Sequence, residues 1–229
     1  MGNGSGPGDD RMSAAPTKGE AGAAATDVAA YAAAVATGAP TPGGGSVVAV
    51  VAALGAALGE MVCRLTADPV DDGATGRELP DALAQMTELR PRLLALAAAD
   101  EAAYRGYIAA AALPKATDAE RTRRRDALQT ALVGAADVPL AVADGCAALA
   151  TLLEPIARLG NRHAVSDVAV GAWLAEAALR GALLNVRVNA RLMRDETRRG
   201  AYEARADAVE ADGLAAVARA LAAATARGA

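Results

Sequence analysis

Apolar residues recur at helical spacing along most of the chain, and no segment alternates polar and apolar residues beside turn signals. The pattern therefore predicts an all-α protein, a single-domain antiparallel helical bundle with long, proline-kinked helices. The predicted helices cover about residues 27–37, 46–66, 80–112, 117–160, 167–194 and 197–226.

Helix boundaries are marked by capping residues and by helix breakers. Thr117 and Glu120 form a capping box, and Ser46 and Ser166 are predicted N-caps. The segment after Ser46 is apolar nearly all round until Glu60, which is typical of a helix buried at the centre of a bundle. Three prolines and one glycine are expected to kink, break or interrupt helices: Pro91, Pro139, Pro155 and Gly213.

The N-terminal segment differs in composition from the rest of the chain. Residues 1–25 are rich in Gly, Ala, Ser and Pro and predict a disordered leader, so we expect the folded helical domain over residues 26–229. The chain is 53% hydrophobic but only 2% aromatic, with no Phe. Because most of this apolar content is Ala, Leu and Val, closely packed helices are favoured over a sheet.

Charge and hydropathy exclude several classes of partner. The net charge is −4, and no block of Lys and Arg lacks acidic neighbours, so nucleic acid is not expected as a partner. The longest uncharged apolar stretch, Ser46 to Gly59, is shorter than the roughly 20 residues that cross a membrane. Cys63 and Cys146 lie in helical apolar patterns and are typical of core residues in a reducing compartment. Without a visible secretion signal, we expect a cytoplasmic protein.

The most specific segment is Pro40-Thr41-Pro42-Gly43-Gly44-Gly45-Ser46. Three glycines let the backbone approach a ligand and lead directly into a helix N-terminus, whose free N–H groups favour an anion or a carbonyl oxygen. The spacing matches neither a Walker A loop nor a dinucleotide fingerprint. A tight turn between helices that needs positive φ is the structural alternative.

Three further groups of polar residues are candidates for chemistry. Asp100 and Tyr104 share a helical face with Tyr107, so Tyr104 could stack on a flat heterocycle while Asp100 holds a cation or acts as a base. An amphipathic rim would explain the same face. The second group is Asn161, His163, Ser166 and Asp167. Capping is the alternative for Ser166 and Asp167, and a solvated loop side chain is the alternative for His163. The third group is Asn185 and Asn189, which would either tie helices together or present donors and acceptors to a ring.

Metal binding has little support in the sequence. The single His and two distant Cys do not make a ligand set, and no Glu-x-x-His spacing occurs. We therefore expect neither a metal nor another cofactor.

Taken in order, these segments resemble the formiminotetrahydrofolate cyclodeaminase and methenyltetrahydrofolate cyclohydrolase family. The resemblance covers about residues 26–194. It is carried by residues 40–46, Met61-Val62, Leu65-Thr66, Asp100-x-x-Ala103-Tyr104, Leu113-Pro114-Lys115, Val138-Pro139-Leu140, Gly160-Asn161, Ser166-Asp167 and Asn185-Val186-x-x-Asn189.

The resemblance implies an all-helical enzyme, usually dimeric, that makes or breaks the N5–C–N10 one-carbon bridge of a tetrahydrofolate. Asp100 or Asp167 would stabilise positive charge or accept a proton, and Lys115 or His163 would return one. Pro42, Gly43, Gly44, Gly45, Ser46, Tyr104, Asn161, Ser166, Asn185 and Asn189 would bind the substrate. Since no formiminotransferase domain is attached, the cyclohydrolase reaction is favoured slightly over the cyclodeaminase reaction.

Two departures from the family pattern leave an alternative. The stretch from Ala67 to Arg77 is acidic where relatives tend to be basic and aromatic, and His163 stands where a small or amide side chain is expected. These features would suit a non-catalytic or repurposed helical binder of a pterin or another heterocycle.

Overall fold

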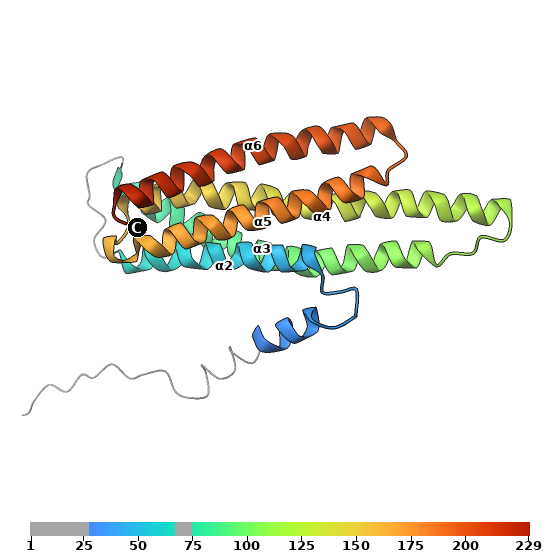
Figure 1. The fold of residues 1–229 in the computed structure, drawn as a ribbon, viewed down its shortest axis with the longest axis horizontal. Coiled ribbons are helices and arrows are strands. Elements are labelled where there is room, and N and C mark those ends of the chain that lie inside the picture. The colour runs from blue at the N-terminus through green and yellow to red at the C-terminus, as the bar shows by residue number, and fades with distance from the viewer. Residues whose placement is uncertain (1–27, 67–74) are drawn as a thin grey trace, which may run out of the picture. The chain divides into compact units, whose positions relative to one another are not determined.

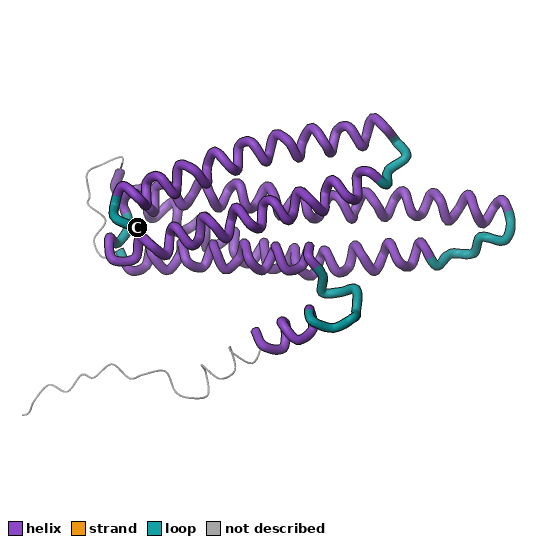
Figure 2. The backbone as a smooth tube through the Cα atoms, in the orientation of Figure 1, coloured by secondary structure: helices purple, strands orange, loops and turns teal. Residues whose placement is uncertain are grey.

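The computed structural model describes residues 28–66 and 75–229. The predicted leader and most of the acidic loop lie outside these residues. All regular elements of the described chain are helical, as predicted (Figures 1 and 2). They are a short helix at 28–35, α2 (Gly44–Leu65), the 3-10 turn η1 (Thr75–Arg77), α3 (Glu78–Ala111), α4 (Asp118–Leu159), the 3-10 turn η2 (Arg162–Ala164), α5 (Val165–Arg191) and α6 (Glu196–Ala226).

Residues 41–229 form one compact unit, a bundle of the five long helices, and the short helix at 28–35 belongs to a separate unit. Within the bundle, α4 contacts α2, α3, α5 and α6. The α3–α4 hairpin extends past the ends of α5 and α6 (Figure 1). It therefore presents a tip of its own, made by the end of α3, the connection at 112–117 and the start of α4.

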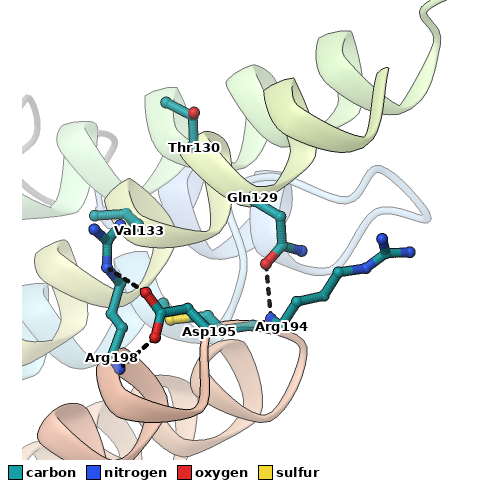
Figure 3. A pocket seen from close by; sticks show the side chains of 7 residues that line it. Gln129, Thr130, Val133, Arg194, Asp195 and Arg198 are labelled. Carbon is teal, nitrogen blue, oxygen red and sulfur yellow. Dashed lines mark hydrogen bonds and ion pairs between the residues drawn. The ribbon is translucent and has the colours of Figure 1, made fainter. Parts of the chain in front are cut away.

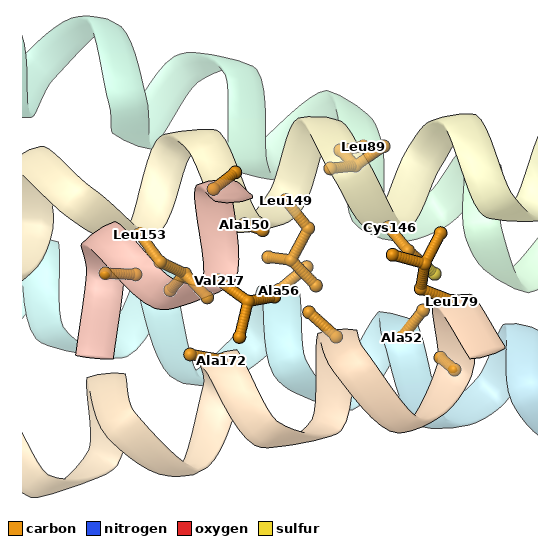
Figure 4. Packing of buried hydrophobic residues seen from close by; sticks show 14 of the residues in the cluster. Ala52, Ala56, Leu89, Cys146, Leu149, Ala150, Leu153, Ala172, Leu179 and Val217 are labelled. Atoms are coloured by element: carbon orange, nitrogen blue, oxygen red, sulfur yellow. The ribbon is translucent and has the colours of Figure 1, made fainter. Parts of the chain in front are cut away.

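Small residues let the helices of the bundle approach closely. At the crossing of α2 and α5, a Cβ on Gly55 would lie 3.2 Å from the carbonyl oxygen of Gly171. Around this crossing, fully buried alanines of α2 and α5 face leucines of α4 (Figure 4). Cys63 and Cys146 are buried as predicted, and burial raises the pKa of Cys63 to about 11 and of Cys146 to about 12.

Helix α4 runs unbroken through Pro139 and Pro155, so of the bend or break expected at each proline the break does not occur. Proline lacks an N–H group and leaves the carbonyl four residues earlier without its helical donor. For Pro139 that carbonyl belongs to Ala135, and it accepts a hydrogen bond of 2.7 Å from Nδ2 of Asn189 on α5. A neighbouring helix thus supplies the donor that the proline removes.

Some predicted helix ends are correct and others are not. The capping box of Thr117 and Glu120 is confirmed. Ser46, however, is the third residue of α2 rather than its cap, and α5 begins at Val165, before Ser166. Helix α6 continues through Gly213. A Cβ there would lie 2.6 Å from Cδ2 of Leu179, so this glycine makes room for α5 and does not interrupt α6.

Helix α2 is not enclosed on all sides, contrary to the expectation of a central helix. Leu54 is 56% exposed and Leu65 is 51% exposed, so an apolar stripe lies on its outer face. By length and hydropathy alone, α2 and α4 could each cross a membrane. The uncharged apolar stretch noted in the sequence, from Ser46 to Gly59, is shorter than either helix. Core helices of soluble proteins meet the same criterion, and 56% of the apolar window of α2 is buried within the bundle.

Candidate active site

The glycine segment leads into the N-terminus of α2. Gly43 is the N-cap residue, and no side chain caps the helix. A Cβ on Gly45 would overlap both carboxylate oxygens of Asp100, whereas nothing lies within 4 Å of a Cβ on Gly44. Gly228 is the only glycine with positive φ in the described chain. The expected positive-φ turn is therefore wrong, and glycine is required at 45 by the close approach of α3.

Asp100 holds the central position of this candidate site. Its carboxylate accepts a hydrogen bond from the backbone N–H of Ser46 at the positive end of the α2 dipole. Burial raises the pKa of Asp100 above its ordinary value of 3.8, the Ser46 N–H opposes this rise, and the charge of Glu101 adds to it. A half-buried carboxylate with a raised pKa is suited to exchange protons nearer neutral pH.

Glu101 is a member of the site that was not singled out from the sequence. The buried Ser46 hydroxyl donates to Oε1 of Glu101 at 3.3 Å, and Arg105 lies 3.6 Å from Oε2. Residues adjacent in a helix point in different directions, so helical spacing gave no reason to group Glu101 with Asp100. The available signal was the pair of neighbouring carboxylates in an otherwise alanine-rich segment.

The two tyrosines of α3 have different surroundings. Tyr104, one turn after Asp100, is 37% exposed and remains accessible to a ligand. Tyr107 packs against a small separate cluster made by Leu132, Ala136 and Met193. Only Tyr104 therefore stays in the candidate site.

The two asparagines of α5 make structural hydrogen bonds. Nδ2 of Asn185 donates to the carbonyl of Gly181 on its own helix at 2.9 Å. Because a Cβ on Gly181 would lie 2.6 Å from Val48, Asn185 lies at the same end of the bundle as Ser46. Nδ2 of Asn189 donates to the Ala135 carbonyl, so this side chain has a structural role in the support of Pro139.

The segment from Asn161 to Asp167 lies at the opposite end of α2. Asn161 donates to the carbonyl of Leu65 at 2.9 Å, its backbone N–H donates to Thr66, and its side chain accepts from the N–H of His163. These bonds fasten η2 to the C-terminus of α2. Asn161 is thus the capping residue here, while His163 and Ser166 are exposed.

The sequence-predicted residues therefore fall into three places within one chain. The segment from Pro42 to Ser46 lies with Asp100, Tyr104 and Asn185 at one end of α2. Asn161, His163, Ser166 and Asp167 lie at the other end, roughly 28 Å away by helical rise. Lys115 lies at the α3–α4 tip. Neither Lys115 nor His163 can exchange a proton with Asp100 of the same chain.

The groups at the N-terminus of α2 suit a planar, positively charged ligand. Two carboxylates would stabilise positive charge, and an accessible tyrosine offers a face for stacking. In the described part of the chain, no group of three or more His, Cys, Asp or Glu is arranged to hold a metal ion. The arrangement can support acid–base chemistry on a cationic heterocycle.

Comparison with known proteins relates this chain to folate enzymes. The family model described as formiminotransferase-cyclodeaminase matches residues 27–208. The chain is 40% identical to methenyltetrahydrofolate cyclohydrolase of Methylorubrum extorquens over 70% of its own length and 77% of that protein. It is 37% identical to formimidoyltransferase-cyclodeaminase of Gallus gallus over 68% of its length, but this covers only 29% of the chicken protein.

A solved structure agrees with these relatives. Formiminotetrahydrofolate cyclodeaminase from Thermotoga maritima superposes with a TM-score of 0.74 and 31% sequence identity, covering 84% of this chain and 92% of the other. The likeness therefore extends over nearly the whole bundle.

Proposed function

Because the chain belongs to the formiminotransferase-cyclodeaminase family, we propose that it acts on the N5–C–N10 one-carbon bridge of a tetrahydrofolate derivative. The favoured reaction is hydrolysis of 5,10-methenyltetrahydrofolate. Cyclodeamination of a formimino derivative, which closes the same bridge, is the second candidate.

The observation that carries this proposal is the placement of Asp100 at the N-terminus of α2. The methenyl bridge is a delocalised cation, and a carboxylate close to it lowers the energy of positive charge. Gly45 makes room for that carboxylate, and the raised pKa of Asp100 makes it a better proton acceptor than an ordinary aspartate. Tyr104 would stack on the flat ring system.

In the hydrolytic reaction, a water oxygen bonds to the bridge carbon and one water proton passes to Asp100. The tetrahedral intermediate then loses its hydroxyl proton as a C=O bond forms. The bond from carbon to N5 breaks, and N5 takes up a proton. One proton is released overall, and the product carries a formyl group on N10.

Cyclohydrolase is favoured by the relative from Methylorubrum extorquens, because the match covers 77% of that protein. The Thermotoga maritima structure favours cyclodeaminase. Both reactions pass through a tetrahedral carbon flanked by nitrogens, so one set of carboxylates could serve either.

Two assays of the purified protein separate these reactions. Ring opening of methenyltetrahydrofolate removes its near-ultraviolet absorbance, and cyclodeamination of formiminotetrahydrofolate releases ammonia. We expect a faster absorbance loss than in buffer alone. Ammonia release without absorbance loss would replace the favoured reaction by the second, and no turnover of either substrate would contradict the proposal.

We also propose that the protein is a homodimer formed through the outer face of α2 and α5. Flanking the Gly55–Gly171 crossing, Leu54 is 56% exposed, Val170 is 42% exposed and Trp173 is 57% exposed. Contiguous exposed apolar side chains of this kind are typical of an interface. Pairing of two copies about a two-fold axis would bury this face on both of them.

Trp173 is the only tryptophan of the chain and reports directly on this interface. Trp173→Lys should shift the protein from dimer to monomer in light scattering at micromolar concentration, because two lysines would face each other across the axis. In the parent, the tryptophan emission should move to longer wavelength on dilution. A parent that is monomeric at these concentrations would contradict the dimer.

A cytoplasmic location is proposed as well. It is supported by the two buried thiols, which are free in the structure and compatible with a reducing compartment. Fractionation of cells should recover the protein with cytoplasmic markers.

A further inference from the structure

Gly134 of α4 has open space beside it although it is partly buried. Nothing lies within 4 Å of a Cβ built on this residue, yet the residue itself is only partly exposed. The other described glycines with open space at the Cβ position are all exposed: Gly38, Gly44, Gly106, Gly200 and Gly228. The space beside Gly134 is therefore bounded by the protein, whereas theirs opens directly to solvent.

Neither backbone conformation nor helix packing requires a glycine at position 134. Its φ is not in the positive region that favours glycine. Packed glycines of the same bundle have a close neighbour, as at Gly145, where a Cβ would lie 2.8 Å from Cδ2 of Leu93. Glycine weakens the interior of a helix, so Gly134 is costly for α4 without allowing a close contact in return. The room that it leaves is what distinguishes it from alanine here.

Helical spacing places this open space opposite Tyr104. Helices α3 and α4 run antiparallel as a hairpin (Figure 1), and they approach closely at Leu93 and Gly145. Gly134 lies about three turns before Gly145 on α4, and Tyr104 lies the same number of residues after Leu93 on α3. Gly134 and Tyr104 therefore lie on the facing sides of the two helices, at the same level of the hairpin. The facing sides are closely packed at Gly145 and open at Gly134.

The contacts around Tyr104 agree with this placement. Tyr107, one turn further along α3, packs on a cluster that includes Leu132 and Ala136, and these two residues lie on either side of Gly134 in the sequence of α4. Tyr104 itself is 37% exposed. No atom of its ring lies within 4 Å of a Cβ on Gly134, so the ring does not fill the space.

Hydrogen bonds on the other sides of α4 hold this stretch of the helix in place. Nδ2 of Asn189 on α5 donates to the carbonyl of Ala135 at 2.7 Å, and Oε1 of Gln129 accepts from the backbone N–H of Arg194 at 2.8 Å. Figure 3 shows Gln129 beside the connection that leads into α6, where a separate hollow of about 270 Å³ lies. Because α4 is fastened to α5 and to this connection, the space beside Gly134 does not depend on a movement of the helix.

We propose that Gly134 is a specificity-determining residue of the candidate active site, forming the wall that faces Tyr104 across a flat ring of the ligand. This inference rests on the proposed function, which supplies a ligand with a flat, fused ring system. One face of the ring would stack on Tyr104, and the other would lie against helix backbone that no side chain covers at Gly134. Asp100 is one turn before Tyr104 on the same side of α3, a rise of roughly 6 Å. The charged part of the ring system then reaches the carboxylate.

A side chain at position 134 would occupy the volume that the ring needs. Alanine would place a methyl group in the open space, and leucine would fill more of it. Alanine and leucine are both better helix formers than glycine, so stability and ligand binding should change in opposite directions. This opposition distinguishes a wall of the site from a residue that supports the fold.

The first test measures the affinity of the full chain for folic acid by calorimetry. Folic acid is a suitable probe because it has a flat pterin ring and no one-carbon bridge. Gly134→Ala should weaken its binding by about fivefold or more, and Gly134→Leu by about tenfold or more. The matched control is Gly200→Ala on α6, which also has open space at the Cβ position and should bind folic acid as the parent does.

Thermal melts of the same proteins show whether the fold is intact. Gly134→Ala and Gly200→Ala should each melt at the parental temperature or higher. A lower melting temperature of Gly134→Ala would contradict the open space. Parental affinity for folic acid in the Gly134 variants, or a parent that does not bind folic acid, would overturn the proposal.

Steady-state kinetics on methenyltetrahydrofolate separate a wall from a hinge in the hairpin. A wall predicts that Gly134→Ala raises KM and leaves kcat unchanged. Gly106→Ala, at an exposed glycine of α3 beside the same level of the hairpin, should keep both parental values. Equal losses of kcat in the two variants at parental KM would assign both glycines to bending of the hairpin and would overturn the wall.

The outcomes also separate this inference from the proposed reaction. Folic acid binding that depends on residue 134, in a protein that turns over neither folate substrate, would retain the wall and contradict the reaction. Turnover of methenyltetrahydrofolate with KM and folic acid affinity unaffected by Gly134→Leu would retain the reaction and overturn the wall.

Discussion

The two ends of α2 carry the two segments on which the resemblance depended most, yet they are built differently. At the N-terminus, Gly45 admits the carboxylate of Asp100, and a buried Ser46 donates to Glu101. At the C-terminus of α2, Asn161 makes hydrogen bonds to Thr66, Leu65 and His163. The N-terminal end of α2 therefore has a half-buried carboxylate, whereas the polar groups of Asn161 at the C-terminal end are hydrogen-bonded within the protein.

This difference teaches how to separate chemical from structural residues when both occur in recognisable motifs. Polar groups whose hydrogen bonds are satisfied by nearby backbone serve folding. A carboxylate that is partly buried, with a raised pKa and a neighbouring negative charge, is costly for folding and is retained for another reason. By this criterion the site belongs to the N-terminal end of α2.

The largest expected effect comes from Asp100→Asn. The amide keeps the shape but removes the charge and the proton acceptor, so kcat/KM on methenyltetrahydrofolate should fall by about 10²-fold or more. Asp167→Asn, at the opposite end, is the matched control and should leave kcat/KM within about twofold of the parent. Full activity in Asp100→Asn, or loss of activity in Asp167→Asn alone, would reverse the comparison.

A second pair of variants separates the two adjacent glycines. Gly45→Ala forces a methyl group against the Asp100 carboxylate and should cost about 1–3 kcal/mol of stability, with at least roughly tenfold lower activity. Gly44→Ala meets open space in the same helical turn, so its stability should be equal or higher by up to about 1 kcal/mol. Thermal melts and the absorbance assay measure both. Equal behaviour of the two variants would show that the close approach is unimportant.

At the other end of α2, Asn161→Ala should affect stability more than chemistry. It removes the donor to the Leu65 carbonyl and the acceptor for the His163 N–H, at a cost of about 1–2 kcal/mol. Denaturant unfolding measures this loss. The kcat of the folded variant should match the parent, and a kcat lowered tenfold at unchanged stability would assign the segment to the active site instead.

The smallest effect is a pH dependence of stability at Asp100. Because its folded pKa lies above 3.8, the folded protein retains a proton that the unfolded chain releases, so the unfolding free energy decreases as pH rises between the two values. Asp100→Asn removes this decrease. The unfolding free energy of the variant minus that of the parent should therefore rise with pH and level off above the folded pKa. The rise should be no more than a few tenths of a kcal/mol at this partly exposed group, measured by denaturant unfolding across the pH range. A difference that shrinks with increasing pH would contradict the raised pKa.

The helices and their order could be predicted because helical periodicity and capping are local properties. The capping box of Thr117 and Glu120 formed as expected, since its bonds join residues three apart. At Pro139 and Gly213 the helices continue without a break, and this outcome depends on distant residues: Asn189 supplies a donor to the helix of Pro139, and Leu179 packs on Gly213. Local rules describe what each proline or glycine removes, but not what a neighbouring helix restores.

The sequence by itself determined the helical class, the family resemblance and the candidate residues, because these depend on residue types and their spacing along the chain. Only the tertiary structure decided which candidates lie together. It brought Asp100 to Gly45 and added Glu101, and it separated Lys115 and His163 from them. The reason is physical: proton transfer and charge stabilisation act over a few ångströms, and in an antiparallel bundle residues far apart in sequence reach that distance while members of one motif list can lie at opposite ends of a helix.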